Sequence, residues 1–108
     1  MSTFSVNVIA DAEEDLFDIY RYIASNDSHT NAEYVFNNIV QVCESLLELP
    51  ERGHIVPELE RVGVMEYRQL HFKPYRIIYR IDNKQVFVYA ILDGRRDIKD
   101  LLEMRVLR

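Results

Sequence analysis

The sequence predicts an α+β fold in which a pair of helices packs against a mainly antiparallel sheet. The N-terminal half carries apolar residues at helical spacing in two successive segments, whereas the C-terminal half carries short alternating or continuously apolar segments typical of strands. The chain has 108 residues, of which 48% are apolar and 29% are charged. This length and composition suit one packed core, so we expect a single domain over residues 1–108.

The N-terminal half is predicted to form a strand followed by a helical hairpin. Apolar and polar residues alternate over Phe4–Val8, as in a half-buried strand. Capping-box patterns at Asp11–Glu14 and Thr30–Glu33 predict two helix starts, and turn residues at 25–28 separate the helices. Pro50 and Gly53 are expected to end the second helix. The apolar stripes comprise Ala12, Leu16, Ile19, Tyr20 and Ile23 in the first helix, and Ala32, Val35, Phe36, Ile39, Cys43, Leu46 and Leu49 in the second.

The C-terminal half is predicted to form a three-stranded meander and a short helix. Residues 51–63 are expected to be a connecting loop, and Val64–Phe72 the first strand. The next strand places Tyr75, Ile77, Tyr79 and Ile81 on one face, with Arg76, Ile78 and Arg80 on the other. The continuous apolar run Val86–Leu92 is typical of a central strand buried on both sides. After a turn at 93–97, Ile98, Leu101 and Leu102 indicate the short C-terminal helix.

Charge is distributed unevenly along the chain. Residues 1–60 contain twelve acidic and two basic side chains, whereas residues 61–108 contain eleven basic and six acidic ones. Such polarity is typical of a protein whose basic surface meets an anionic partner, either nucleic acid or an acidic protein segment. Neutralisation of the basic sheet by the acidic helices within the fold is an equally good explanation.

Three local patterns in this element order resemble the ParE/RelE family of toxins. The first is Asp15-Leu16-x-x-Ile19-x-x-Tyr22-Ile23 in the first helix, and the second is Leu49-Pro50-x-x-Gly53 at the end of the second helix. The third joins the last strands to the turn after them. It consists of Tyr75-Arg76-Ile77-Ile78-Tyr79-Arg80 and Ile91-Leu92-x-Gly94-Arg95-Arg96-Asp97. Together the patterns span residues 4–97.

The resemblance implies the toxin of a type II toxin–antitoxin, or plasmid stabilisation, system, neutralised by a cognate antitoxin. RelE-type members cut messenger RNA on the ribosome, whereas ParE-type members interfere with DNA gyrase. The long helical hairpin and the Gly94–Asp97 ending resemble the ParE type. A toxin that inhibits gyrase by protein binding is therefore favoured. A ribosome-dependent endoribonuclease and a non-toxic co-repressor that acts with its antitoxin are the alternatives.

A nuclease of the RelE type would need acid–base groups and cations on the phosphate. The candidates at matching positions are Arg68, His71, Arg76 and Arg95. The second lysine of the family pattern falls on Leu70, and its C-terminal tyrosine falls near Leu101 or Leu102. His71 has a suitable ordinary pKa, but a sheet-edge histidine without a catalytic role is the more common case. These losses, and the sequence pI of about 5.1, favour the gyrase hypothesis.

The residues predicted to bind a partner are basic. Arg76 and Arg80 share a strand face and, if that face is opposite the helices, they point outward beside Arg68 as a basic stripe. A solvated sheet face with cross-strand pairs to acids is the alternative, but only Glu66 and Asp82 lie nearby, so partner binding is favoured. Arg95 and Arg96 follow the last strand, where a turn presents them to a partner. An ion pair with Asp93 or Asp97 is the structural alternative for these two arginines.

Nothing in the sequence predicts a cofactor, a metal site or a membrane span. No apolar run approaches the roughly 20 residues that a membrane-spanning helix needs, and no secretion signal is recognisable. Cys43 is the single cysteine and lies in the apolar stripe, so it is expected to be a core residue. We therefore expect a cytoplasmic protein. Homo-oligomers and hetero-oligomers with the antitoxin both remain open.

Overall fold

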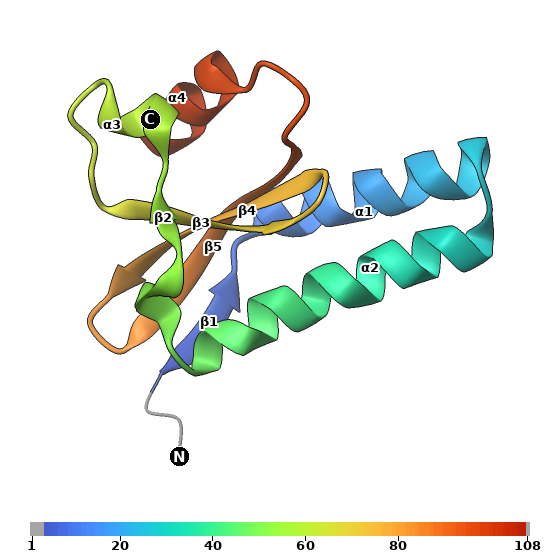
Figure 1. Cartoon of the computed structure of the whole chain (residues 1–108), viewed down its shortest axis with the longest axis horizontal. Helices are drawn as coiled ribbons and strands as arrows, with labels where there is room; N and C mark the ends of the chain where they lie inside the picture. Colours follow the sequence, from blue (N-terminus) through green and yellow to red (C-terminus); the bar gives the residue numbers. More distant parts are fainter. Residues whose placement is uncertain (1–3, 108) are drawn as a thin grey trace.

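A computed structural model describes residues 4–107; residues 1–3 and 108 of the predicted domain lie outside the described residues (Figure 1). Within this range, five strands form one sheet in the order β1-β5-β4-β3-β2. The strands are β1 (Ser5–Val8), β2 (His54–Ile55), β3 (Tyr67–Phe72), β4 (Tyr75–Asp82) and β5 (Gln85–Asp93). β1 runs parallel to β5, and the other neighbours are antiparallel. The predicted sheet and its three-stranded meander are confirmed.

The predicted helical hairpin is formed by α1 (Ala10–Asn26) and α2 (His29–Glu44), which cover one face of the sheet (Figure 1). The apolar stripes form the main core with β4 and β5, and Ile39 is fully buried there. Phe36 is only half-buried, because its ring packs within the hairpin against Phe17 and Tyr20. Leu49 was predicted to continue the second stripe, but it lies beyond α2 and is exposed.

Both predicted capping boxes are wrong. The backbone N–H of Ile9 still donates to Val88 O of the sheet at 3.1 Å, so α1 begins directly at the end of the strand pairing. Its N-cap residue is Ile9, whose side chain makes no capping hydrogen bond. In α2 the cap is Ser28, whose Oγ accepts from the backbone N–H of Asn31 at 3.0 Å. The short link between the helices thus starts α2 earlier than its sequence pattern indicated.

The sheet face opposite the hairpin is covered by α3 (Pro57–Glu60) and α4 (Lys99–Leu107) (Figure 1). The C-terminal helix was predicted, but the interpretation of residues 51–63 as a plain loop is wrong. Val56 and Leu59 from that segment are fully buried. They belong to a second core, which consists of Val56, Leu59, Tyr67, Ile78, Ala90, Leu92, Ile98 and Leu102.

An aromatic side chain holds the segment between α2 and β2 against the sheet. The hydroxyl of Tyr79 in β4 donates to Pro50 O at 2.6 Å and accepts from the backbone N–H of Gly53 at 3.1 Å. A Cβ atom at position 53 would collide with this hydroxyl and lie 2.8 Å from Gln69 O. The spacing of Pro50 and Gly53 after α2 therefore serves the docking of this segment on Tyr79.

β5 is irregular where β1 ends. β4 pairs Ile78 with Ala90 but Tyr79 with Val88, so Tyr89 is an extra residue in β5. β1 reaches only to Val88, and two side chains bond the β5 edge beyond it. Asp15 of α1 accepts from the backbone N–H of Ile91 at 3.0 Å. Arg105 of α4 donates to Tyr89 O at 3.3 Å and to the Asp15 carboxylate at 2.5 Å. We call Asp15 and Arg105 the edge clasp; it joins a helix from each face of the sheet.

Replacing Asp15 by Ala should destabilise the fold by about 2–4 kcal/mol, because the Ile91 N–H loses its acceptor and the largely buried Arg105 guanidinium loses its nearest carboxylate. Arg105 keeps Tyr89 O at 3.3 Å and the more distant carboxylate of Asp11 at 3.9 Å. Urea unfolding of the purified variant measures this change. Asp18→Ala is the matched control on α1, since Asp18 is exposed and forms a surface ion pair with Arg21. Equal small losses for both variants would show that the edge clasp adds nothing to stability.

Candidate functional site

The predicted stripe of three sheet arginines does not exist, because the register places them on different faces. Arg68 lies opposite Tyr79 in the β3–β4 ladder, and directly paired residues share a face. Tyr79 belongs to the core beneath the hairpin, so Arg68 is on the hairpin face. Arg80 pairs with Tyr67, which belongs to the second core, and Arg76 is on that same face.

Arg68 is partly exposed and fastens the segment that leads into β2. Its Nη1 donates to Gly53 O at 2.9 Å and to Glu51 O at 3.1 Å. A guanidinium has five N–H donors, so some of its bonding capacity still faces solvent. Arg68 thus has a structural role and remains accessible to a partner.

Arg76 was expected to point outward, and this expectation is wrong. Its side chain is only 11% exposed and forms a two-pronged ion pair with Glu58 of α3, at 2.7 and 2.8 Å. Its Nε also donates to Gln69 Oε1 of β3 at 2.8 Å. The acid that pairs with Arg76 comes from the segment interpreted as a loop, which folds back over this face.

The ion pair with Arg76 makes the Glu58 carboxyl more acidic. Hydrogen bonding to Arg76 lowers the pKa of the Glu58 carboxyl below its ordinary value of 4.5, against the opposing effect of desolvation. The carboxylate is therefore charged throughout the neutral range, and Arg76 stays engaged. Gly94 completes the arrangement, because a Cβ there would lie 2.9 Å from both Cγ and Cδ of Arg76. The turn after β5 thus rests directly on the arginine stem.

His71 is exposed at the end of β3, directly opposite Arg76 in the ladder. Its pKa is lowered from 6.5, first by partial desolvation and then by the charges of Arg76, Lys73 and His54. Within residues 4–107, no side chain forms a hydrogen bond with its ring. A catalytic histidine is normally oriented by such a partner, so the geometry gives His71 no sign of general acid–base work.

Arg80 is half-buried at the far end of β4. Its guanidinium carbon lies 6.0 Å from the ring centroid of Tyr67, within the range of a cation–π contact. A long 3.5 Å ion pair joins it to Asp82. Arg80 is the one member of the predicted stripe that is both partly exposed and on the expected face.

Arg95 and Arg96 lie in the exposed turn between β5 and α4, as predicted. Arg95 pairs with Asp93 at 2.7 Å, and its side chain is 72% exposed. Hydrogen bonding to Arg95 lowers the pKa of the Asp93 carboxyl. Arg96 is exposed, and its backbone N–H donates to Asp93 O at 3.2 Å. The turn therefore presents two cations to solvent, one of them already paired.

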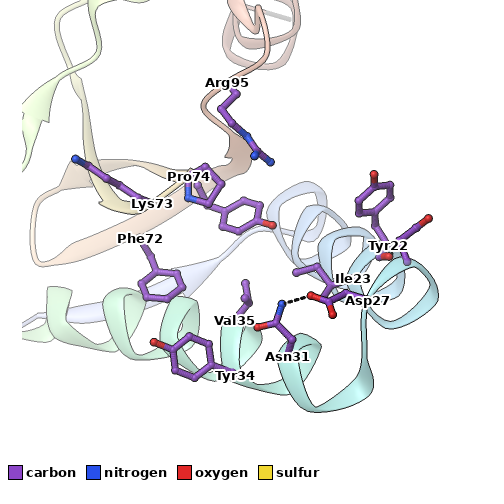
Figure 2. A pocket seen from close by; sticks show the side chains of 12 residues that line it. Tyr22, Ile23, Asp27, Asn31, Tyr34, Val35, Phe72, Lys73, Pro74 and Arg95 are labelled. Carbon is purple, nitrogen blue, oxygen red and sulfur yellow. Dashed lines mark hydrogen bonds between the residues drawn. The ribbon is translucent and has the colours of Figure 1, made fainter.

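A cleft of about 740 Å³ lies between the tip of the hairpin and the β3–β4 turn. Figure 2 shows Lys73 and Arg95 on its sheet side and Tyr22 and Tyr34 on its helical side. The ring centroids of Tyr34 on α2 and Phe72 on β3 lie 6.0 Å apart at the cleft. Because Tyr22 and Tyr34 are 69% and 59% exposed, the cleft offers aromatic surface to a partner.

Two comparisons with known proteins identify the family. The family model described as "ParE toxin of type II toxin-antitoxin system, parDE" matches residues 6–98. Toxin ParE3 of Caulobacter vibrioides is 30% identical over 84 residues, which are 78% of this chain and 80% of that protein. The chain belongs to the ParE toxin family of type II toxin–antitoxin systems.

Solved structures similar to this ParE-family chain support the fold alone. One is titled as the chromosomal ParDE system from P. aeruginosa, with a TM-score of 0.67 and 20% identity over 82% of this chain and 94% of that one. Another is the RelBE2 toxin–antitoxin complex from Mycobacterium tuberculosis, with a TM-score of 0.64 and 18% identity over 86% and 93%. The fold is therefore common to ParE-type and RelE-type relatives and does not distinguish their targets.

Sequence reasoning missed the groups that complete this ParE-family site. Glu58 and Gln69 hold Arg76, and no local pattern links them to it. Tyr34 carried a usable signal, since an aromatic residue off the apolar stripe of α2 is expected to be exposed. Cys43 is buried in the main core, which confirms its prediction as a core residue, and this burial raises the pKa of its thiol to about 11. Within residues 4–107, His, Cys, Asp and Glu side chains form no group of three that would hold a metal ion, and no helix is suited to cross a membrane.

The Glu58–Arg76 pair should make stability fall in acid. Because the folded pKa of Glu58 is depressed, its contribution is present above pH 4.5 and is lost as pH falls through that lower folded pKa. At pH 7, Glu58→Gln should cost about 1–3 kcal/mol. The difference in free energy of unfolding between this variant and wild type, measured by urea unfolding, should become smaller as the pH falls below 4.5. Glu60→Gln, which alters an exposed acid on α3, should show no such change; a gap for Glu58→Gln that is constant down to pH 3 would contradict the assignment.

Proposed function

We propose that this chain is a toxin that inhibits DNA gyrase by protein binding, and that a cognate antitoxin neutralises it. Membership of the ParE toxin family supports the first part. The observation that carries the choice of mechanism is the engagement of Arg76, whose guanidinium is held by Glu58 and Gln69. Both proposed partners would place the protein in the cytoplasm.

The nuclease alternative requires side chains that are free to bind phosphate and to transfer protons, and the candidate positions do not offer them. Arg76 stands where a RelE-type enzyme would hold phosphate, yet Glu58 already satisfies it. Near the position of the family tyrosine, Leu102 is fully buried and cannot transfer a proton. His71 has no orienting partner among residues 4–107, and a general base without one is poorly positioned. Binding of a protein target therefore accounts better for the arrangement than RNA cleavage.

The proposed gyrase-binding residues are Arg95 and Arg96. Both are exposed in a turn that Gly94 anchors, because the Gly94 N–H donates to Pro74 O at 2.8 Å. The turn is thus fixed at its base while its cations project outward. Arg68 and Arg80 are less exposed and lie on opposite faces of the sheet, toward the end of β4 that is distant from this turn, so they are not part of the proposed interface. Arg76 serves stability.

The antitoxin is proposed to insert an amphipathic segment into the cleft. Tyr22, Tyr34 and Phe72 would receive its apolar side chains, and Lys73 with Arg95 would meet its acids. Because Arg95 lines the cleft, a segment bound there would also cover the proposed gyrase-binding turn. The toxin and antitoxin would then form a hetero-oligomer, and the bound antitoxin would neutralise the toxin by blocking access of gyrase to this turn.

Replacing Arg95 and Arg96 together by Ala should relieve growth inhibition and restore supercoiling by purified gyrase. The melting temperature should hardly change, because both side chains are exposed and surface ion pairs contribute little. His71→Ala is the comparison variant and should remain fully inhibitory. A parallel assay should detect no translation-dependent RNA cleavage by the wild type.

Three outcomes would overturn this mechanism. The enzyme alternative would replace it if gyrase were unaffected and His71→Ala lowered RNA cleavage by roughly 10²–10⁴-fold in a folded protein. The co-repressor alternative would replace it if expression of the wild type without antitoxin left growth and both assays unchanged. If the Arg95/Arg96 double variant still inhibited gyrase, the gyrase-binding surface would have to lie elsewhere on the protein.

Antitoxin binding should depend on the aromatic lining of the cleft. Tyr34→Ala should weaken the complex by about tenfold or more, since buried tyrosines at interfaces are frequent energetic anchors. Titration of the co-expressed antitoxin by calorimetry measures the change. Met104→Ala is the control, because Met104 is 69% exposed on α4 and away from the cleft. Equal affinities of the two variants would place the antitoxin on another surface.

A further inference from the structure

The surroundings of Arg76 have the features of an anion-binding site that is already filled. Both oxygens of Glu58 meet the guanidinium end-on, accepting from Nη1 at 2.7 Å and from Nη2 at 2.8 Å. The same fork of N–H donors matches the oxygens of carboxylate and phosphate groups. Glu58 therefore lies where an external oxyanion would bind if this side chain were removed.

The guanidinium is held in place independently of Glu58. Gln69 Oε1 accepts from its Nε at 2.8 Å and from its Nη2 at 2.5 Å. Gly94 packs on the aliphatic stem of Arg76 so closely that a Cβ at position 94 would come within 2.9 Å of it. With the stem and one edge fixed, the edge facing Glu58 stays oriented for an oxyanion whichever molecule supplies it.

Basic side chains cluster at this position. His71 is paired with Arg76 in the ladder and shares its face, so the Cβ atoms of the two residues are expected to lie about 5 Å apart. Lys73 follows two residues later, and His54 pairs with Gln69 from β2. Desolvation is the largest cause of the lowered pKa of His71, and the positive charges of Arg76, Lys73 and His54 lower it further.

We propose that Arg76 and His71, positioned by Gln69, form a phosphate-binding site that Glu58 of α3 fills as a built-in carboxylate. Glu58 then determines specificity, because it closes this sheet face to phosphate groups. A phosphate ligand binds only by displacing a carboxylate that is tethered beside the site and thus has a high effective concentration. The site goes beyond the proposed gyrase function. Both proposals use the contact between Glu58 and Arg76, but phosphate binding by the Glu58 variants does not require that the protein inhibit gyrase.

Removing the Glu58 carboxylate should open the site. The test compares Glu58→Ala and the neutral isostere Glu58→Gln with wild type and with Glu60→Ala, an exposed-acid control on the same helix. Melting temperature is followed against inorganic phosphate and dimethyl phosphate, with sodium chloride matching the ionic strength. Inorganic phosphate represents a terminal phosphate group and dimethyl phosphate a phosphodiester, so the stronger response identifies the source. Acetate is included because it should replace the missing carboxylate.

At ten times the dissociation constant, phosphate should raise the melting temperature of Glu58→Ala by roughly 5–10 °C, from the linkage between binding and stability. Wild type and Glu60→Ala should match their chloride controls. Adding His71→Ala to the Glu58→Ala protein should weaken phosphate binding several-fold, and phosphate should raise the pKa of His71, measured by NMR, only when Glu58 is replaced.

Two results would overturn the proposal. One is a folded Glu58→Ala or Glu58→Gln protein in which phosphate and acetate act no differently from chloride. The other is an equal response of wild type and variants, which would place phosphate elsewhere on the surface. Glu58→Gln retains the size of the side chain, so it carries the test if Glu58→Ala fails to fold.

Discussion

The arrangement of this protein depends on one constraint, which is that β4 and β5 are apolar on both faces. Tyr79, Val86 and Val88 contribute to the core beneath the helical hairpin, whereas Ile78 and Ala90 contribute to the second core. Apolar surface on both sides of a sheet has to be buried on both sides. The hairpin covers one face, so the other requires cover from segments with weaker helical patterns, and α3 and α4 provide it.

That second layer determines the chemistry of the sheet arginines. Folding α3 over the sheet brings Glu58 to Arg76, and a guanidinium taken from water needs a charged partner with good geometry. Arg76, which could otherwise bind phosphate on this face, is thereby engaged in an ion pair within the protein. Among the arginines predicted to bind a partner, Arg95 and Arg96 in the turn after β5 are the exposed ones, which is why the proposed protein-binding mechanism centres on them.

The edge clasp shows how the two layers are joined. β1 is shorter than β5, and the bulge at Tyr89 leaves backbone groups that no strand satisfies. Asp15 from the hairpin layer and Arg105 from the second layer bond these groups and each other. Because buried backbone groups need partners, one pair of side chains closes the sheet edge and also ties α4 to α1.

The sequence by itself determined the periodic parts of the protein: the helical hairpin, the antiparallel meander and the alternation of Tyr79 and Ile78 between faces. These follow from local spacing, and the motifs around them were enough to indicate the ParE/RelE family. Only the tertiary structure decided that residues 51–63 form a covering layer, that Arg68 and Arg76 lie on opposite faces, and that Asp15 meets Arg105. Register and long-range ion pairs join residues far apart in the chain, so no local period encodes them.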